Sequence, residues 1–305
     1  MIFDNMKNQK PSISIIIPTY NRPQKLAMCL DSLTKLDYPK HHFEVIVVDD
    51  GSKIDLEPVV EPFKNQLELT LLKIDNSGPA NARNRGAELA KGSYIAFTDD
   101  DCQPATNWLN NFAARFAVSP NCLVGGKTLN ALPANLYSTA SQELTEYLYD
   151  YYHLINPKQV SFFASNNFAL PKEKFLQIGG FDISFTAAAS EDRELCDRWL
   201  NSNYPMIYAP EIQIYHAHDL TLFSFLRQHF NYGRGAFDFH QIREARQAPP
   251  IEVEPKSFYF NMLSYPFSKK LQQPRILVSS LFFTSQFAGA VGFFWRKLNC
   301  KYFNS

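Results

Sequence analysis

Three consecutive aspartates, Asp99, Asp100 and Asp101, are the residues whose type and spacing most directly suggest chemistry. Their mutual repulsion requires a counter-charge, and carboxylate oxygens favour hard cations such as Mg²⁺ or Mn²⁺. Such ions keep few protein ligands and take the others from substrate phosphates. Arg83 and Arg85 come shortly before, and arginine suits bidentate contact with phosphate. Together these residues predict a site for a metal and a nucleotide diphosphate.

Four short apolar segments are predicted to be the strands that position these side chains, and the first two are typical of a strand buried on both faces. They cover residues 13–18, 43–48, 67–74 and 93–98, with helical patterns at 24–36 and 79–91 between them. This alternation predicts a parallel sheet with right-handed crossovers, and ligands of such sheets bind beyond the carboxyl ends of the strands. Four polar clusters should therefore meet at one edge: Thr19–Asn21, Asp49–Ser52, Asn76–Gly78 and Asp99–Asp101. Further helices are expected at 108–117, 191–201 and 220–232, and residues 131–163 fit no clear pattern.

Composition narrows the class of protein. The 305 residues include 30 Lys or Arg and 30 Asp or Glu, a formal net charge of zero, which argues against nucleic acid as a partner. The five cysteines show no CxxC spacing and the N-terminus is polar, so we expect a cytoplasmic protein without a disulfide framework. A dinucleotide-binding GxGxxG is absent, and Gly126-Lys127-Thr128 lacks the first glycine of a phosphate loop.

The C-terminal segment differs from the rest of the chain. Residues 246–257 contain three prolines and are predicted to be a linker, and residues 276–295 carry no formal charge. A helix of that length spans about 30 Å, enough for a bilayer core, and basic residues flank both ends. Three interpretations stay open: a helix on a membrane surface, a membrane span, and a helix buried in the protein. We predict one domain over 1–245, then a linker and a hydrophobic helical segment over 246–305, with peripheral membrane contact through 258–300.

Five motifs, in this order and spacing, resemble the family-2 glycosyltransferases of the GT-A fold. They are SIIIPTYNRPQKL at 14–26, VIVVDDGS at 45–52, GPANARNRGAELAKGSYIAFTDDDC at 78–102, SNNFALPKEKFLQIGGFD at 165–182 and SEDRELCDRWL at 190–200. The resemblance covers about three quarters of the chain. It implies an α/β fold with a mostly parallel sheet flanked by helices. It also implies an inverting enzyme of the hexosyltransferase type that acts in polysaccharide biosynthesis. The basic, aromatic C-terminal segment favours an acceptor at a membrane, so we expect the protein at the inner face of the cell membrane.

The resemblance further implies a role for each matching residue. Asp99 and Asp101 correspond to the family's DxD motif, which binds Mn²⁺ or Mg²⁺, with Asp101 as the more direct ligand. His216 falls where some members supply a further metal ligand, and His218 offers the same chemistry. A nucleotide-sugar donor, with UDP as the nucleotide, would contact Pro18, Thr19, Tyr20, Asn21, Asp49, Asp50, Gly78, Arg83, Asp99, Asp100, Asn166 and Asn167.

Sugar transfer makes demands that explain these residue types. The departing diphosphate gains negative charge, which a metal and cationic groups stabilise. The acceptor, a hydroxyl group of a glycan or of a lipid-linked molecule, needs a base to remove its proton. Asp192, in the Glu191-Asp192 pair that opens a predicted helix, corresponds to this base. A single base and direct displacement would invert the anomeric configuration.

Two other classes of protein are weighed against this one. A sugar-nucleotide nucleotidylyltransferase would share the sheet and the metal, but residues 18–26 lack the glycine-rich loop of that class. A non-enzymatic, membrane-associated scaffold with a degenerate nucleotide site is disfavoured because Asp99, Asp101 and Asp192 are all present. Residues 227–235 lack the Gln-x-x-Arg-Trp motif of processive polysaccharide synthases, which makes a processive synthase less favoured.

Overall fold

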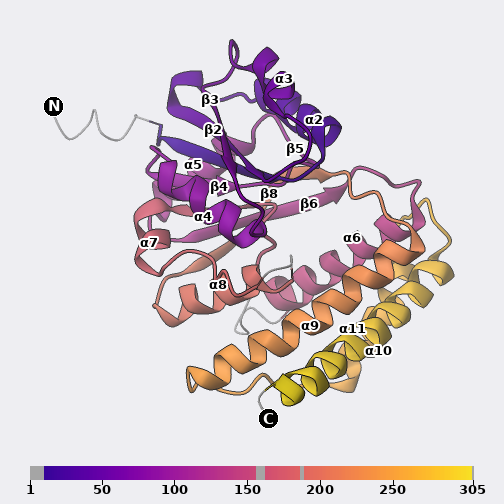
Figure 1. Cartoon of the computed structure of the whole chain (residues 1–305). Coiled ribbons are helices and arrows are strands. Elements are labelled where there is room, and N and C mark those ends of the chain that lie inside the picture. Colours follow the sequence, from indigo (N-terminus) through magenta and orange to yellow (C-terminus); the bar gives the residue numbers. More distant parts are fainter. Residues whose placement is uncertain (1–9, 156–161, 186–188, 304–305) are drawn as a thin grey trace. The chain divides into compact units, whose positions relative to one another are not determined.

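The computed structural model describes residues 10–155, 162–185 and 189–303, and the chain forms two compact units (Figure 1). The first unit comprises Met1–Thr128, Phe162–Thr186 and Leu195–Tyr215. The second comprises Leu129–Ser161, Ala187–Glu194 and His216–Ser305. Each unit has its own hydrophobic core, and the two are described separately.

The first unit is built on an eight-stranded sheet with the order β3-β2-β1-β4-β7-β6-β8-β5. Strands β3, β2, β1 and β4 pair in parallel, which confirms the predicted arrangement, whereas β7 is antiparallel to both β4 and β6. The strands are β1 (Ile13–Thr19), β2 (Phe43–Asp50), β3 (Leu69–Ile74), β4 (Tyr94–Phe97), β5 (Cys102–Pro104), β6 (Leu123–Asn130), β7 (Phe168–Pro171) and β8 (Met206–His216).

The register of the sheet explains why the polar clusters converge. Thr19 at the end of β1 lies opposite Asp49 on β2, so the parallel strands end at nearly the same level. Phe97, the last residue of β4, pairs with Phe168, the first residue of β7. Because these two strands run antiparallel, the residues just before β7 lie next to the residues just after β4.

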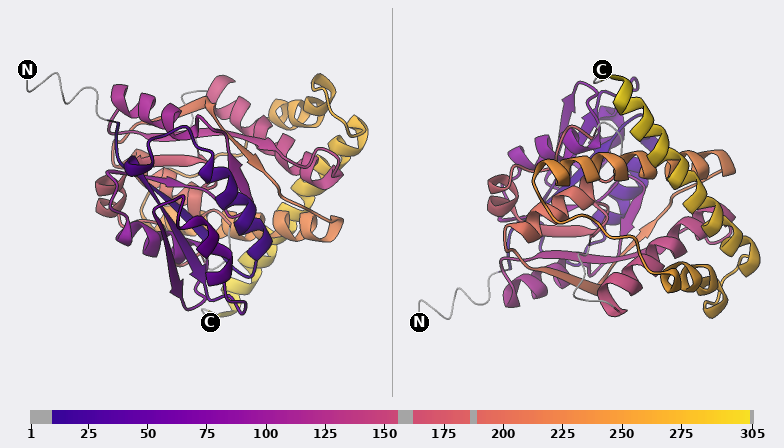
Figure 2. Two further views of the ribbon diagram at one scale, coloured as in Figure 1. Left: turned by 90° about the horizontal axis from the view of Figure 1, so that it is seen from above. Right: turned by 90° about the horizontal axis from the view of Figure 1, so that it is seen from below.

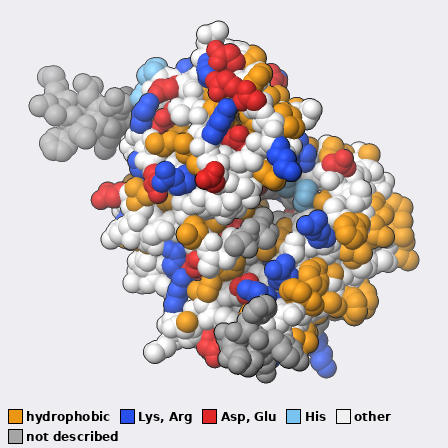
Figure 3. Space-filling model, viewed as in Figure 1, with side chains coloured by type: hydrophobic (Ala, Val, Ile, Leu, Met, Phe, Trp, Pro, Cys, Tyr) orange, Lys and Arg blue, Asp and Glu red, His pale blue; other side chains and the backbone are white. Residues whose placement is uncertain are grey.

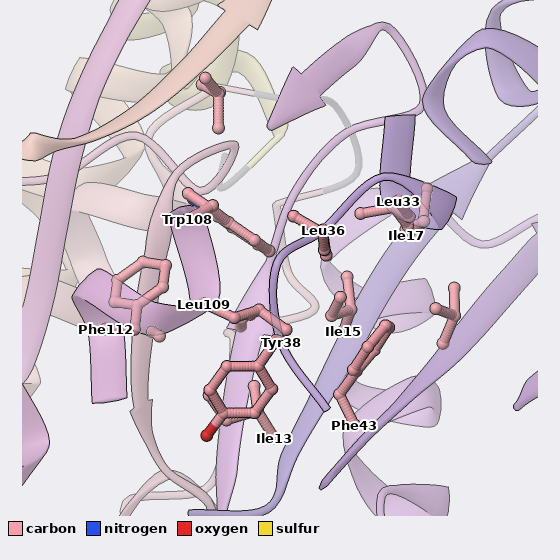
Figure 4. Close-up of a cluster of buried hydrophobic side chains, with 14 of the residues drawn as sticks. Ile13, Ile15, Ile17, Leu33, Leu36, Tyr38, Phe43, Trp108, Leu109 and Phe112 are labelled. Carbon is pink, nitrogen blue, oxygen red and sulfur yellow. The ribbon is translucent and has the colours of Figure 1, made fainter. Parts of the chain in front are cut away.

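Helices cover both faces of the sheet. On one face α2 and α5 bury a large apolar cluster that includes Ile15, Leu33 and Trp108 (Figure 4). On the other face α4 packs closely, because a Cβ on Gly86 would press against Ile16 of β1. The helices of this unit are α2 (Pro23–Thr34), α3 (Glu57–Val60), α4 (Pro79–Leu89), α5 (Trp108–Val118) and α7 (Lys172–Gln177), with 3₁₀ turns η1 (Lys40–His42) and η2 (Glu61–Phe63). Helix α8 (Glu191–Asn201) begins with residues of the second unit and continues from Leu195 with residues of the first.

The second unit is helical, and its core is formed by side chains such as Leu144, Phe225, Phe258 and Phe282. Figure 2 shows α9 and α11, which pack against each other, in two further views. Its elements are α6 (Leu136–Tyr149), the π-helical η3 (Asp150–Ile155), α9 (Leu222–Ala245), α10 (Lys256–Ser264), the 3₁₀ turn η4 (Tyr265–Ser268) and α11 (Arg275–Phe303).

The structure departs from the sequence prediction around α9. The helix predicted over 220–232 is α9, which continues through Gly233 and Gly235 to Ala245. A Cβ on Gly233 would collide with the carbonyl oxygen of Gly289 on α11, so this glycine serves a helix–helix contact. The predicted linker is also held in place: the Glu254 carboxylate accepts hydrogen bonds from the Tyr151 and Tyr152 hydroxyls, at 3.0 and 2.6 Å. The domain boundary predicted at residue 245 stays a prediction.

One buried polar group in this unit makes its stability depend on pH. The ring of His229 on α9 is buried and lies edge-on to Phe225, with ring centroids 4.4 Å apart. Burial, together with the nearby His218, lowers the pKa of His229 to about 4. In the unfolded chain the same ring titrates near its ordinary value of 6.5.

We predict that His229→Phe weakens the loss of stability in acid. The unfolded chain binds a proton at His229 below about pH 6.5 while the folded chain resists it until about pH 4. The contribution is therefore fully present above pH 6.5 and is lost as the pH falls toward 4. Over this window the wild type should lose about 3 kcal/mol more than the variant. Urea unfolding followed by circular dichroism on both sides of the window measures this, with the exposed His41→Phe as control. Equal pH dependence of wild type and His229→Phe would contradict the prediction.

Candidate functional site

The three aspartates after β4 are held by basic side chains from two helices of the first unit. The Arg22 guanidinium lies 2.8 Å from Asp100 and 3.1 Å from Asp101. The Lys25 ammonium lies 3.1 Å from Asp101. Arg83, buried on α4, donates a hydrogen bond to Asp99 at 2.8 Å. Each carboxylate of the triplet therefore has a cationic partner.

Arg22 and Lys25 lie beside the acidic triplet but were not identified from the sequence. A metal cation was predicted as the counter-charge of the aspartates instead. The signal that identifies them is positional: both follow β1 directly, and β1 is the neighbour of β4 in the sheet. In a parallel sheet, residues that follow neighbouring strands share an edge.

Asp100 is the electrostatic centre of the cluster. Its side chain is fully buried, and it accepts a hydrogen bond from the Thr19 hydroxyl at 2.7 Å. Burial, with the adjacent charges of Asp101 and Asp99, raises the pKa of Asp100 to about 7, although Arg22 and Thr19 act to lower it. Arg22 therefore favours the ionised form of Asp100, whose pKa would rise further without it.

The loops after β1, β2 and β3 are tied to one another beside this cluster. The Asp50 carboxylate accepts hydrogen bonds from the backbone N–H groups of Ser77 and Gly78, each at 2.9 Å. Asn21, in a left-handed conformation with φ of 55°, accepts a hydrogen bond from the Lys53 N–H at 2.8 Å. Gly78, with φ of 95°, makes the turn into α4. Asp50 thus positions a loop, and its expected contact with a base remains a prediction.

The remaining expected donor residues of this unit lie around the same edge. Asp49 accepts a hydrogen bond from the Ser52 N–H at 2.9 Å, which closes the turn after β2. Pro18 and Thr19 are buried at the end of β1, whereas the Tyr20 ring is exposed and open to a planar ligand. Of Pro18, Thr19 and Tyr20, Tyr20 is therefore the residue whose side chain is exposed.

Asn166 and Asn167 precede β7 and differ in how they are used. The Asn167 side chain accepts a hydrogen bond from the Trp108 indole N–H at 2.9 Å. It also donates to the carbonyl oxygens of Lys127 and Ile212, at 3.0 and 3.1 Å. These bonds fasten β6, β8 and α5 together and occupy both amide donors, so we assign Asn167 a structural role. Asn166 is buried and accepts a hydrogen bond from the Thr128 hydroxyl at 3.3 Å, and its contact with a sugar remains a prediction.

The donor set of the acidic cluster suits a hard divalent cation. Asp99 and Asp101 present carboxylate oxygens within one turn of chain, and the Asp99 side chain is half-buried. Oxygen ligands of this type favour Mg²⁺ or Mn²⁺ over softer metals. Asp101 is paired with both Lys25 and Arg22, so its carboxylate is stabilised by positive charge.

The expected catalytic pair belongs to the second unit. Ser190 has a strained φ of 76° and leads into α8. The Glu191 carboxylate is buried and accepts a hydrogen bond from the Ala189 N–H at 2.8 Å, so it holds the start of the helix. The Asp192 carboxylate is only half-buried and accepts from the Arg193 N–H at 2.8 Å. Of the two, Asp192 has the exposure that contact with a ligand requires.

The two expected histidine ligands also lie in the second unit. His216 ends β8, and its ring stacks on that of His218 with centroids 4.9 Å apart. Both side chains are half-buried. Their coordination of a metal together with Asp99 and Asp101 remains a prediction.

Comparison with known proteins identifies similar chains. The model of the family described as "Glycosyl transferase family 2" matches residues 14–179. The glycosyltransferase AglE of Haloferax volcanii is 36% identical over 124 residues, which cover 40% of each chain. Validoxylamine A glucosyltransferase of Streptomyces hygroscopicus subsp. limoneus is 29% identical over 231 residues, which cover 66% of this chain and 50% of that protein. The chain thus spans half or less of the length of these relatives.

Solved structures resemble the fold over almost the whole chain. The mannosyltransferase PcManGT of Pyrobaculum calidifontis, in complex with GDP-Man and Mn²⁺, has a TM-score of 0.65 at 18% identity. The alignment covers 95% of this chain and 89% of that one. TarS residues 1–349 of S. aureus, in complex with UDP-GlcNAc, has a TM-score of 0.58 at 17% identity, with 92% and 89% covered. These neighbours show a GT-A-type fold, which confirms the predicted fold class.

We predict that Arg22→Gln destabilises the protein by about 2 to 4 kcal/mol at neutral pH, because it leaves the buried Asp100 without its cation. Arg85→Gln is the matched control, since Arg85 is an exposed arginine paired with Glu88. The double variant Arg22→Gln/Asp100→Asn should recover most of the lost stability, because it removes both charges. Urea unfolding of the wild type, Arg22→Gln, Asp100→Asn and the double variant gives the coupling energy. A single variant as stable as the Arg85 control would show that the ion pair does not hold Asp100.

Proposed function

Since the chain belongs to glycosyl transferase family 2, we propose that it is an inverting, metal-dependent enzyme that transfers a sugar from a nucleotide-diphosphate donor to a hydroxyl acceptor. The observation that carries the proposal is the acidic triplet at the sheet edge, with three basic side chains around it. This edge also carries the loops of Asp50 and Asn21, which are suited to hold a nucleoside. Diphosphate, metal and nucleoside contacts would thus lie at one sheet edge.

Residues of the first unit would bind the diphosphate end of the donor. Asp99 and Asp101 would hold Mn²⁺ or Mg²⁺, with His216 or His218 as a further ligand. A bound divalent cation supplies Lewis-acid stabilisation of the departing diphosphate. Arg22 and Lys25 would contact the phosphate oxygens, since both have partly exposed side chains at this cluster. Buried Arg83 would keep Asp99 oriented.

Asp192 would act as the base for the acceptor. A carboxylate that removes the hydroxyl proton during attack must reach the ligand, and Asp192 is the less buried member of its pair. Glu191 would position it, because the Glu191 carboxylate holds the Ala189 backbone just before the helix. A single base and direct displacement invert the anomeric centre.

The donor nucleotide and the place of reaction are part of the same proposal. UDP is the nucleotide we propose, because the TarS neighbour binds UDP-GlcNAc, although PcManGT binds GDP-Man. The acceptor would be a glycan or a lipid-linked molecule. We place the reaction in the cytoplasm, at the inner face of the cell membrane, with peripheral membrane contact through residues 258–300.

Calorimetric titration with UDP, GDP, CDP and dTDP, with and without Mn²⁺, tests the donor site. We expect UDP to bind, and to bind at least about tenfold more weakly without the metal, since the diphosphate then lacks its counter-charge. Asp101→Asn should remove the metal dependence, with the exposed Asp55→Asn as control. Binding of none of the four nucleotides by the folded protein would count against an active donor site.

Substitution of the proposed base should separate chemistry from binding. We expect Asp192→Asn to lower transfer by at least about a hundredfold while the affinity for the nucleotide stays within about twofold. Transfer is measured as nucleotide release from the sugar form of whichever nucleotide binds. Glu173→Gln, at an exposed acid in the first turn of α7, is the control. Loss of nucleotide binding in a folded Asp192→Asn protein would overturn the assignment of the base.

A further inference from the structure

Helix α11 exposes a continuous row of large apolar side chains. Ile276, Phe283 and Phe287 are exposed by 67%, 65% and 66%. With Val291, Phe294 and Leu298 they form what we term the apolar stripe, in which successive members are seven, four, four, three and four residues apart. Figure 3 shows hydrophobic side chains gathered on the face of the molecule where α10 and α11 lie. This spacing places the whole stripe on one side of the helix.

The opposite side of α11 is packed against α9. A Cβ on Gly292 would collide with the Phe230 carbonyl oxygen, so the two backbones are close together there. The Arg296 guanidinium also donates a hydrogen bond to Asp238 of α9 at 2.8 Å. Val278 and Phe282 on this side are fully buried. The exposure of the apolar stripe is therefore not a consequence of a loosely attached helix.

By length and composition, α11 could cross a membrane over Arg275–Cys300, and 22% of its apolar window is buried. Crossing would require α9 to enter the bilayer with it or to separate from it. On α9 the charged residues Arg227, Arg234 and Asp238 make entry costly. Separation would expose Asp238 and Arg296 without their ion pair. An orientation parallel to the membrane avoids both costs, because only the apolar stripe is inserted.

Charge in this part of the chain is strongly one-sided. Residues 255–305 contain seven Lys or Arg and no Asp or Glu, although the whole chain is balanced at 30 and 30. Lys270 and Arg275 are exposed near the start of α11, and Lys297 is exposed near its end. Phe260 and Phe267, on α10 and η4, add exposed rings. Basic residues beside exposed aromatic rings complement anionic lipid headgroups above an acyl layer.

We propose that α10 and α11 form a docking surface for an anionic bilayer, with α11 parallel to the membrane plane and the apolar stripe inserted at the boundary between headgroups and acyl chains. Arg275, Lys270 and Lys297 would contact lipid phosphates. This inference deepens the membrane contact of the proposed function and rests on that contact, not on the identity of the sugar or the base. A second copy of the chain covering the stripe is the alternative that the experiment must exclude.

Trp295 provides an internal reporter. The chain has three tryptophans, and Trp108 and Trp199 are fully buried whereas Trp295 is 46% exposed beside the stripe. The full chain is mixed with vesicles of phosphatidylcholine, with and without phosphatidylglycerol, and binding is followed by flotation and by the blue shift of tryptophan emission. We expect binding to the anionic vesicles and at least about tenfold weaker binding to the neutral ones. Absence of flotation with anionic vesicles would overturn the proposal.

Two sets of variants separate the apolar and the charged contributions. Phe283→Ser/Phe287→Ser should weaken binding by about tenfold or more, because both exposed rings lose their apolar contact. Leu89→Ser/Val118→Ser, at exposed apolar positions of the first unit, is the matched control and should bind as the wild type does. Lys270→Gln/Arg275→Gln should weaken binding by about fivefold for each charge removed. Equal binding by the stripe variant and the control would overturn the proposal.

Three further readouts decide between arrangements. Release of bound protein by alkaline carbonate is expected for the parallel orientation, whereas retention would indicate a span and overturn it. Light scattering should give a monomer, and a dimer that Phe283→Ser/Phe287→Ser dissociates would assign the stripe to a second copy. Nucleotide titration of the same variants should match the wild type. A variant that loses vesicle binding but keeps nucleotide binding has a defect in the docking surface alone. A variant that loses nucleotide binding but keeps vesicle binding has a defect in the donor site alone.

Discussion

The negative charge of three aspartates at the carboxyl end of β4 has to be balanced by cationic side chains of the first unit. Asp100 is fully buried, and an ionised carboxylate in such a place is stable only when it is paired. Helices α2 and α4 follow β1 and β3, and the parallel order of the sheet brings their first turns to the edge where β4 ends. The crossovers of the fold therefore supply Arg22, Lys25 and Arg83 as well as covering the sheet. The charge of the aspartates is therefore balanced by side chains that the fold brings to the same edge.

Sequence alone predicted the parallel half of the fold and the acidic centre of the site. Strands β1, β2 and β4 are short apolar runs buried on both faces, and that pattern survives without knowledge of their partners. Strands β5, β6 and β7 were missed, because β5 and β7 have only three and four residues and β6 contains two glycines. The resemblance identified the residues before β7, but the sequence did not show which contacts their side chains make. Asn167 looks like a ligand contact in sequence and proves to fasten three elements through its amide.

The second unit shows a different limit of sequence reasoning. Gly233, Gly235, Gly289 and Gly292 weaken the helical signal of α9 and α11, since glycine inside a helix is unfavourable in isolation. The reason for Gly233 and Gly292 is visible only in the structure, where the backbones of the two helices come into close contact, whereas Gly235 lies against the backbone of Ala189. The sequence of residues 131–163 showed no clear pattern for a related reason. Helix α6 passes into a π-helical stretch whose tyrosines donate hydrogen bonds to Glu254, about a hundred residues later. Local pattern carries no information about such partners.

The contact between α9 and α11 also constrains protein engineering. Because the backbones meet at glycines on both helices, a larger residue at position 233 or 292 has to be accompanied by a shift of the partner helix. The proline-containing stretch that separates the two helices in the sequence is therefore a poor crossover point for a chimaera. A replacement for α11 would have to carry a glycine at the level where the backbone of α9 approaches it.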